Sequence, residues 1–209
     1  MSVDAVLARI AELQVAASPL RRLAPVTGTA GTTATASGSF AAQLAATAAP
    51  PAALGALPLA GGSPAERMVA AAQAEVGQAE MPPGSNDSPR IAEYRSATSG
   101  GGVGPWCSYF VSWAARGAGV PLGEMGQGFA SVSAVDAWAQ RTGRSIPAGP
   151  GVRPNPGDLV LWGGRHIGMV ESVDPDGSVH TIEGNSSDQV SRRAYGPDAG
   201  GATSYVRVG

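Results

Sequence analysis

The spacing of hydrophobic residues divides the region from residue 63 onward into a helical first part and a strand-rich second part. Ser63-Pro64-Ala65-Glu66 has the residues of a capping box with proline at the first helical position, and it predicts a helix that ends near residue 76. Ser88-Pro89 predicts the start of a second helix. Two further helices are expected, at about 106 to 117–119 and about 133–141.

The pattern changes after Pro154-Asn155-Pro156-Gly157, where short apolar runs alternate with turn residues. Strands are expected at residues 158–162, 166–173, 178–183, 189–194 and 203–208. Asp174-Pro175-Asp176-Gly177 predicts a hairpin turn between the second and third of them. Helices followed by short connected strands indicate an α+β fold, with N-terminal helices packed on an antiparallel sheet of about five strands.

The first 62 residues have a different pattern. Apolar residues recur at helical spacing between residues 3 and 15, which predicts an amphipathic helix within 1–16. Residues 24–62 carry no charge and consist mainly of Ala, Gly, Pro, Ser and Thr. Such a segment buries too little apolar area to offset its chain entropy, so 17–62 is expected to be a disordered linker. Residues 63–209 are long enough for one domain with its own core.

Composition excludes several classes of function. The formal net charge of the 209 residues is −2, which does not suit an electrostatic nucleic-acid binder. No apolar run approaches the roughly 18 residues of a membrane span. Asp4, Arg9 and Glu12 interrupt the apolar core that a secretory signal peptide would need, so no such signal is recognised. All basic residues are arginine, which we interpret as the codon bias of a GC-rich bacterial genome.

Cys107 is the only cysteine, and it stands where the third predicted helix begins. The unpaired N–H groups and the dipole at a helix start favour the thiolate, which is the nucleophilic form. The competing interpretation is a thiol buried for packing. His166 lies downstream as a candidate base, followed by Glu183 and Asn185 as candidate groups to orient it. If the strand continues through Gly184, Glu183 and Asn185 point to the same side.

These motifs resemble the CHAP domain, the cysteine, histidine-dependent amidohydrolase/peptidase family related to the NlpC/P60 cell-wall hydrolases. The resemblance covers about 63–209 and rests on four segments in order: Gly-Pro-Trp-Cys-Ser-Tyr-Phe-Val-Ser-Trp at 104–113, Pro-Gly-Asp at 156–158, His-Ile-Gly-Met-Val-Glu-Ser at 166–172 and Ile-Glu-Gly-Asn at 182–185. It implies a papain-like fold and a peptidoglycan hydrolase, either an N-acetylmuramoyl-L-alanine amidase or an endopeptidase. Cys107 would be the nucleophile, His166 the base, Glu183 its orienter and Asn185 a supporting polar group.

The two histidines and one cysteine lack the spacing of zinc ligands, so no metal site is expected, and no cofactor is expected either. The resemblance also implies a place of action. Cell-wall hydrolysis takes place outside the cytoplasm, in the wall or after secretion. Residues 6–14 are similar to the start of hydrolases found beside flagellar genes in GC-rich bacteria. The N-terminal helix is therefore expected to bind a protein partner or a flagellar-type export apparatus.

Several alternatives stay open at the level of sequence. His180 is a second imidazole, but its offset of three from Glu183 puts it on the opposite strand face. Trp106 either belongs to the core or lines a substrate groove, which we also expect to include Asn86 and Gly168. Gly168 leaves room for a neighbouring backbone or for substrate. Besides hydrolysis, the same site would suit an acyl transferase, and an inactive domain could bind cell wall or a partner.

The division into three regions predicts that residues 1–61 add nothing to the stability of the domain. A chain that starts at Gly62 should keep the full cooperative unfolding transition and act normally on soluble wall fragments, because the linker has almost nothing to bury. The measurement compares the Tm and specific activity of the truncated and full-length proteins. A Tm lowered by more than a few degrees would show that the N-terminal helix packs on the domain.

Overall fold

The computed structural model describes residues 61–209, and these hold four helices followed by six strands. The helices are α3 (Pro64–Ala74), α4 (Pro89–Ser96), α5 (Cys107–Gly117) and α6 (Val132–Arg141). They agree with the four predicted helices to within about two residues at most ends. The expected helix within 1–16 and nearly all of the 17–62 linker lie outside the described residues.

The six strands form one antiparallel sheet in the order β1-β6-β2-β3-β4-β5. Its strands are β1 (Ser145–Pro147), β2 (Leu159–Trp162), β3 (His166–Val173), β4 (Val179–Glu183), β5 (Ser191–Tyr195) and β6 (Ser204–Val206). Five of them correspond to the predicted strands, and the α+β prediction is confirmed. The additional strand, β1, lies at one edge of the sheet and has three residues, too few to leave an alternating pattern.

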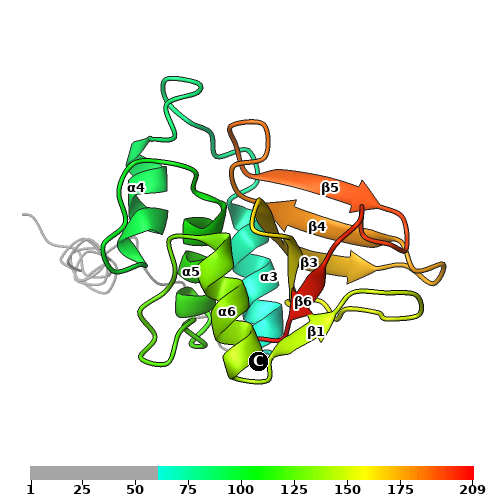
Figure 1. Cartoon of the computed structure of the whole chain (residues 1–209). Coiled ribbons are helices and arrows are strands. Elements are labelled where there is room, and N and C mark those ends of the chain that lie inside the picture. Colours follow the sequence, from blue (N-terminus) through cyan, green and yellow to red (C-terminus); the bar gives the residue numbers. More distant parts are fainter. Residues whose placement is uncertain (1–60) are drawn as a thin grey trace, which may run out of the picture. The chain divides into compact units, whose positions relative to one another are not determined.

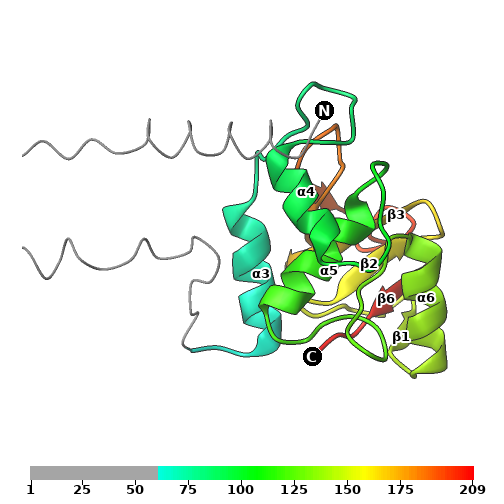
Figure 2. The same ribbon diagram turned by 90° about the vertical axis from the view of Figure 1, so that its left-hand side faces the viewer.

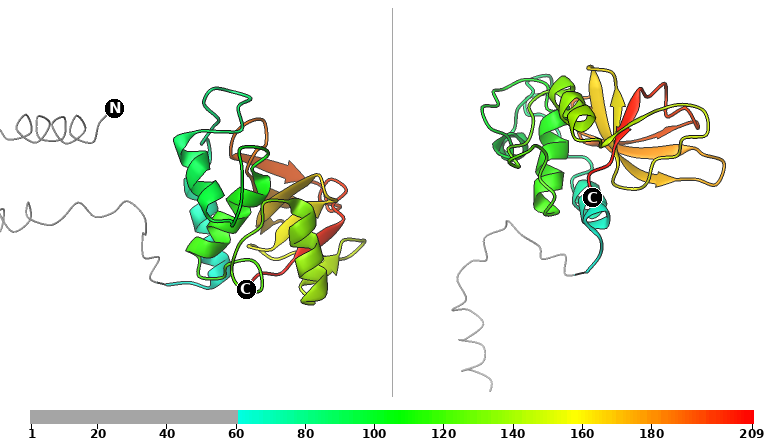
Figure 3. Two further views of the ribbon diagram at one scale, coloured as in Figure 1. Left: turned by 60° about the vertical axis from the view of Figure 1, so that its left-hand side comes forward. Right: turned by 60° about the horizontal axis from the view of Figure 1, so that its bottom comes forward.

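Helices and sheet form two layers, with the helices on one side in Figure 1 and the sheet on the other. Figure 2 is viewed from the helical side, and the right-hand view in Figure 3 shows the sheet fanning away from the helices. No helix within 61–209 combines the length and the apolar character needed to cross a membrane.

Two hydrophobic cores lie on the two faces of the sheet, because side chains alternate along each strand. Leu159 and Leu161 of β2 belong to the core between the sheet and the helices, which includes Phe110 of α5. Val160 and Trp162 belong to the second core on the opposite face. The second core is closed by residues of the loops at 148–152 and 199–202, and the Trp162 indole N–H donates to the carbonyl of Ala199 (2.8 Å).

Side-chain caps fix where the first two helices begin. Ser63 and Glu66 form the predicted capping box of α3. Ser88 Oγ accepts from the N–H of Ile91 at the start of α4 (3.2 Å). The two helices are joined by a buried carboxylate, Glu75, which accepts from the Tyr94 hydroxyl (2.5 Å) and from Nε of Arg90 (2.7 Å).

The helical layer packs tightly against the residue that follows β4. A Cβ placed on Gly184 would lie 2.6 Å from Cβ of Phe110 and 2.9 Å from Cζ3 of Trp106, so only glycine fits between these side chains. Since Gly184 directly follows Glu183 and Trp106 directly precedes Cys107, this contact sets the start of α5 against the end of β4.

Gly184→Ala is expected to destabilise the domain by about 1–3 kcal/mol, the usual cost of overpacking a close contact, and so to lower the Tm by several degrees. Thermal unfolding followed by circular dichroism measures the effect. Gly149→Ala is the matched control, because nothing lies within 4 Å of a Cβ at that position. Equal Tm values for the two variants would contradict the close contact at Gly184.

Candidate active site

Cys107 is the first residue of α5, and this helix begins without the side-chain cap that opens α3 and α4. Trp106 stands at the cap position, and its side chain accepts no hydrogen bond from the first turn. Uncapped N–H groups at a helix start interact favourably with a negative charge. Cys107 exposes only 5% of its surface and forms no disulfide. A thiolate at this position would be shielded from bulk water and held by the end of the helix.

The structure brings His166 together with Cys107 and Glu183. His166 is the first residue of β3, and its Nε2 lies 2.8 Å from Oε2 of Glu183, the last residue of β4. The imidazole stacks on Trp162, with ring centroids 5.4 Å apart and an interplanar angle of 25°. Because Nε2 is engaged by the carboxylate, Nδ1 is the nitrogen left for the thiol.

The electrostatics favour a protonated imidazole at His166. Burial of the His166 ring opposes its protonation, but the hydrogen bonds and charges of Cys107 and Glu183 outweigh it and raise the pKa of His166 to about 9. Burial works against ionisation of Glu183 too, yet hydrogen bonds from His166, Thr181 and Tyr195 keep its pKa below the ordinary value. At neutral pH, His166 is therefore an imidazolium and Glu183 a carboxylate.

The other oxygen of Glu183 has two partners that the sequence analysis missed. Thr181 Oγ1 and the Tyr195 hydroxyl donate to Oε1 at 2.6 and 2.9 Å. Glu183 is only 2% exposed, so these bonds replace the water that an exposed carboxylate would have. Thr181 shares a strand face with Glu183, and the alternation of β4 could have indicated it. Tyr195 lies on β5, and no local pattern indicates its contact with Glu183.

Asn185 supports the site in a different way from the one expected. Strand β4 ends at Glu183, and Asn185 has a positive φ of 58°, so the expectation that both residues point the same way along one strand is wrong. In the amide orientation that satisfies both neighbours, Oδ1 accepts from the backbone N–H of Trp106 (3.2 Å). Nδ2 then donates to Oε1 of Glu80 (3.3 Å). Asn185 thus holds the residue before Cys107, not the imidazole.

Glu80 is a second residue that the sequence analysis missed. Its buried carboxylate accepts from the Trp106 indole N–H (2.9 Å) and from the backbone N–H of Asn86 (2.7 Å), besides Asn185. It therefore connects the loop around Asn86, the start of α5 and the loop after β4. Its position, 27 residues before Cys107 in an irregular segment, carries no recognisable motif.

The structure corrects two of the three residues predicted for the substrate groove. Trp106 is fully buried and donates to Glu80, so it belongs to the core. Gly168 is buried beneath Glu183, where a Cβ would lie 2.7 Å from Cγ of that residue. Its missing side chain makes room for the carboxylate and not for substrate. Asn86 lies in a half-buried loop position, with a φ of 55° and its N–H on Glu80, and stays a candidate for the groove.

His180 does not take part in this arrangement. Its Nε2 pairs with Oδ2 of Asp174 at 2.8 Å, beside the turn between β3 and β4. The alternative assignment of His180 as the base is therefore wrong for this fold. Within residues 61–209, no group of three or more His, Cys, Asp or Glu residues is arranged to hold a metal ion.

Comparison with protein families finds a match to part of the domain. The CHAP domain family model matches residues 98–185, a span that begins before α5 and ends at Asn185. Residues 98–185 are therefore similar to the CHAP domain. CHAP domains are cysteine- and histidine-dependent amidohydrolases or peptidases of the peptidoglycan hydrolase type. No curated protein and no solved structure matches the chain.

The CHAP match contains Cys107, His166, Glu183 and Asn185, but the site extends beyond it at both ends. Glu80 precedes the matched span, and Tyr195 follows it. Glu80 accepts a hydrogen bond from the Trp106 indole, and the Tyr195 hydroxyl donates to Glu183. The residues that hold the CHAP site in place are thus spread over more of the chain than the matched segment.

His166→Ala should slow the alkylation of Cys107 by iodoacetamide about tenfold or more at pH 7, because an imidazolium neighbour favours the thiolate. The raised pKa of His166 means that this support is present below pH 9 and is lost as the pH rises through about 9. The wild-type and His166→Ala rates should therefore converge above that pH. The readout is labelling followed by mass spectrometry.

His180→Ala is the control for this experiment, since His180 pairs with Asp174. It should alkylate at the wild-type rate over the whole pH range. A His180→Ala variant that is slow, with His166→Ala unaffected, would reverse the assignment of the base.

Proposed function

We propose that this protein hydrolyses an amide bond of peptidoglycan through a thiolate mechanism, with Cys107 as nucleophile, His166 as base and Glu183 as the residue that orients His166. The observation that supports it best is the arrangement of a buried carboxylate, an imidazolium and a cysteine at a helix start. The bond is either the one between sugar and peptide or one within the peptide.

The first half of the reaction forms a thioester. The Cys107 thiolate attacks the amide carbonyl carbon, and negative charge develops on the carbonyl oxygen. The backbone N–H of Cys107, at the start of α5, is a suitable donor to that oxyanion. His166 then gives its Nδ1 proton to the leaving amine as the C–N bond breaks. Glu183 remains ionised throughout and stabilises the imidazolium.

The second half consumes water. Neutral His166 accepts a proton from a water molecule as the oxygen attacks the thioester carbonyl. Collapse of the second tetrahedral intermediate expels the Cys107 thiolate and leaves a carboxyl group on the product. The thiolate and imidazolium are then restored, and the net change is one amide bond and one water converted to an acid and an amine.

The remaining polar contacts support the geometry of this reaction. Asn185 and Glu80 bind the backbone and side chain of Trp106, and so hold the donor that follows it in the chain. Since peptidoglycan lies outside the cytoplasmic membrane, we place the activity there. We propose that residues 1–16 take the protein to an export apparatus or partner.

Cys107→Ala and Cys107→Ser should each lower the release of products from purified peptidoglycan by at least about 10³-fold, because the nucleophile is lost. Both should keep the wild-type Tm within about two degrees, since the side chain is small and the fold does not depend on it. Mass analysis of the digest identifies the bond that is cut.

Glu183→Gln should retain more activity than either Cys107 variant, because Glu183 orients the base and does not react. His180→Ala should be fully active. A new amine on the released acyl group would indicate transfer in place of hydrolysis. Full digestion by Cys107→Ala, or none by the folded wild-type protein, would refute the proposal.

A further inference from the structure

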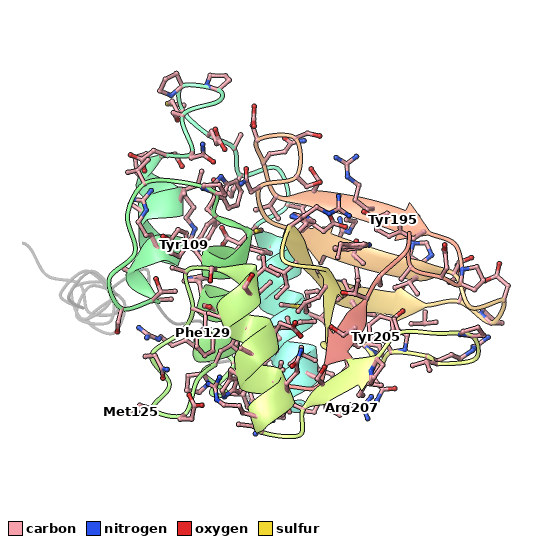
Figure 4. The ribbon with its side chains drawn as sticks, in the orientation of Figure 1. Tyr109, Met125, Phe129, Tyr195, Tyr205 and Arg207 are labelled. Atoms are coloured by element: carbon pink, nitrogen blue, oxygen red, sulfur yellow. The ribbon has the colours of Figure 1, made fainter. Side chains whose placement is uncertain are left out.

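The edge strand β5 contributes one side chain to the carboxylate that orients the base. Figure 4 labels this residue, Tyr195, on β5, together with Tyr205 on the more distant strand β6. The Tyr195 hydroxyl donates to Oε1 of Glu183 (2.9 Å), while Oε2 of the same carboxylate contacts Nε2 of His166 (2.8 Å). Three residues on three neighbouring strands are thus connected through the two oxygens of one carboxylate.

The two oxygens of the Glu183 carboxylate have different partners, and these partners determine its orientation. Thr181 and Tyr195 both donate to Oε1, which fixes the rotation of the carboxylate and leaves Oε2 for the imidazole. Because Glu183 is 2% exposed, no bulk water is available to replace a missing donor. Loss of either hydroxyl would therefore leave Oε1 short of a hydrogen bond inside the protein.

Aromatic contacts hold Tyr195 and the imidazole in one packed group. The Tyr195 ring lies against Trp162, with centroids 5.4 Å apart, and Trp162 stacks on His166 at the same centroid distance. The loop after β5 contacts two of these rings, and its Ala199 carbonyl accepts a hydrogen bond from the Trp162 indole N–H. A Cβ on Gly200 would lie 2.6 Å from Cδ1 of Tyr195, so this loop packs directly on the tyrosine ring.

We infer that Tyr195 is a positioning residue for His166, acting through Glu183, and that Thr181 shares this role. The role of His166 as a base rests on the proposed function, but the contact between Tyr195, Glu183 and His166 does not. The test below therefore uses the imidazole itself as the reporter and needs no substrate.

The direction of the electrostatic effect follows from the hydrogen bond. Burial, with the charge and hydrogen bond of Glu183, raises the pKa of Tyr195 to about 12, against the influence of Arg193, so the hydroxyl stays a neutral donor at working pH. Its hydrogen is the positive end of a dipole directed at the Glu183–His166 pair. Without that dipole, both Glu183 and His166 hold a proton more tightly, and the pKa of each rises. The other ionisable group facing His166 is Cys107.

The experiment follows the two histidines by NMR as a function of pH in the full chain, where His166 and His180 are the only imidazoles. Tyr195→Phe removes the hydroxyl and keeps the ring. Its His166 titration midpoint should move upward by about half a unit to one unit, the size expected for one hydrogen bond. The His180 midpoint should not move, because its partner is Asp174.

Tyr205→Phe is the matched control. Tyr205 belongs to the same second core and is buried, but within the described residues its hydroxyl makes no hydrogen bond to Glu183. It should leave both histidine midpoints where they are. Thr181→Val should raise the His166 midpoint as Tyr195→Phe does. Thr181→Ser keeps a hydroxyl, so its His166 midpoint should lie closer to the wild-type value.

An activity measurement completes the test once a substrate is in hand. Tyr195→Phe should lower kcat about three- to tenfold with little change in KM, since substrate binding is untouched. An unchanged His166 midpoint in Tyr195→Phe would overturn the inference. If the Tm of that variant also fell, Tyr195 would have a packing role only. Failure of the wild-type protein to cut peptidoglycan would refute the proposed function but not the shift in the His166 titration.

Discussion

The close contact between Gly184 and the first turn of α5 is the constraint on which the rest of the site depends. It joins the two layers beside Cys107 and Glu183, because Trp106 directly precedes Cys107 and Gly184 directly follows Glu183. Phe110 and Trp106 occupy the space that a side chain at position 184 would need. Asn185 adds a hydrogen bond from the same loop to the Trp106 backbone. The separation of Cys107 from the sheet is therefore set by rigid packing and not by a flexible side chain.

The charges of the site follow from this packing. A carboxylate that is 2% exposed would be costly to ionise without partners, and Glu183 has three donors in His166, Thr181 and Tyr195. His166 in turn lies between Glu183 and Cys107, and its interactions with these two residues outweigh the burial of its ring and raise its pKa. Each ionised group is thus held in its charged form by the next one. Removing a donor to Glu183 would therefore leave its buried negative charge with fewer partners.

Much of the fold was predictable because its helices and strands depend on residues that are close together in the sequence. The capping box at Ser63 and the alternation along β3 depend on residues close together in the chain, and both were found where expected. The assignments that failed depend on tertiary contacts. The expectation that Asn185 and Glu183 point the same way required the strand to continue through Gly184, but β4 ends at Glu183 and Asn185 has a positive φ. Tyr195 and Glu80 are in reach of the site only because β5 pairs with β4 and the loop before α4 returns to Trp106.

The two halves of the site belong to different cores. Cys107 is part of the core between helices and sheet, whereas the face of the sheet that carries Glu183 and Thr181 looks toward the second core, with Trp162 beneath His166. The loop at 196–201 fixes Trp162 and Tyr195 from outside. A substitution in that loop is therefore expected to shift Trp162 and, through it, the His166 ring, without moving α5. Cys107 and His166 are thus supported by different cores, and the close packing at Gly184 joins the start of α5 to the end of β4.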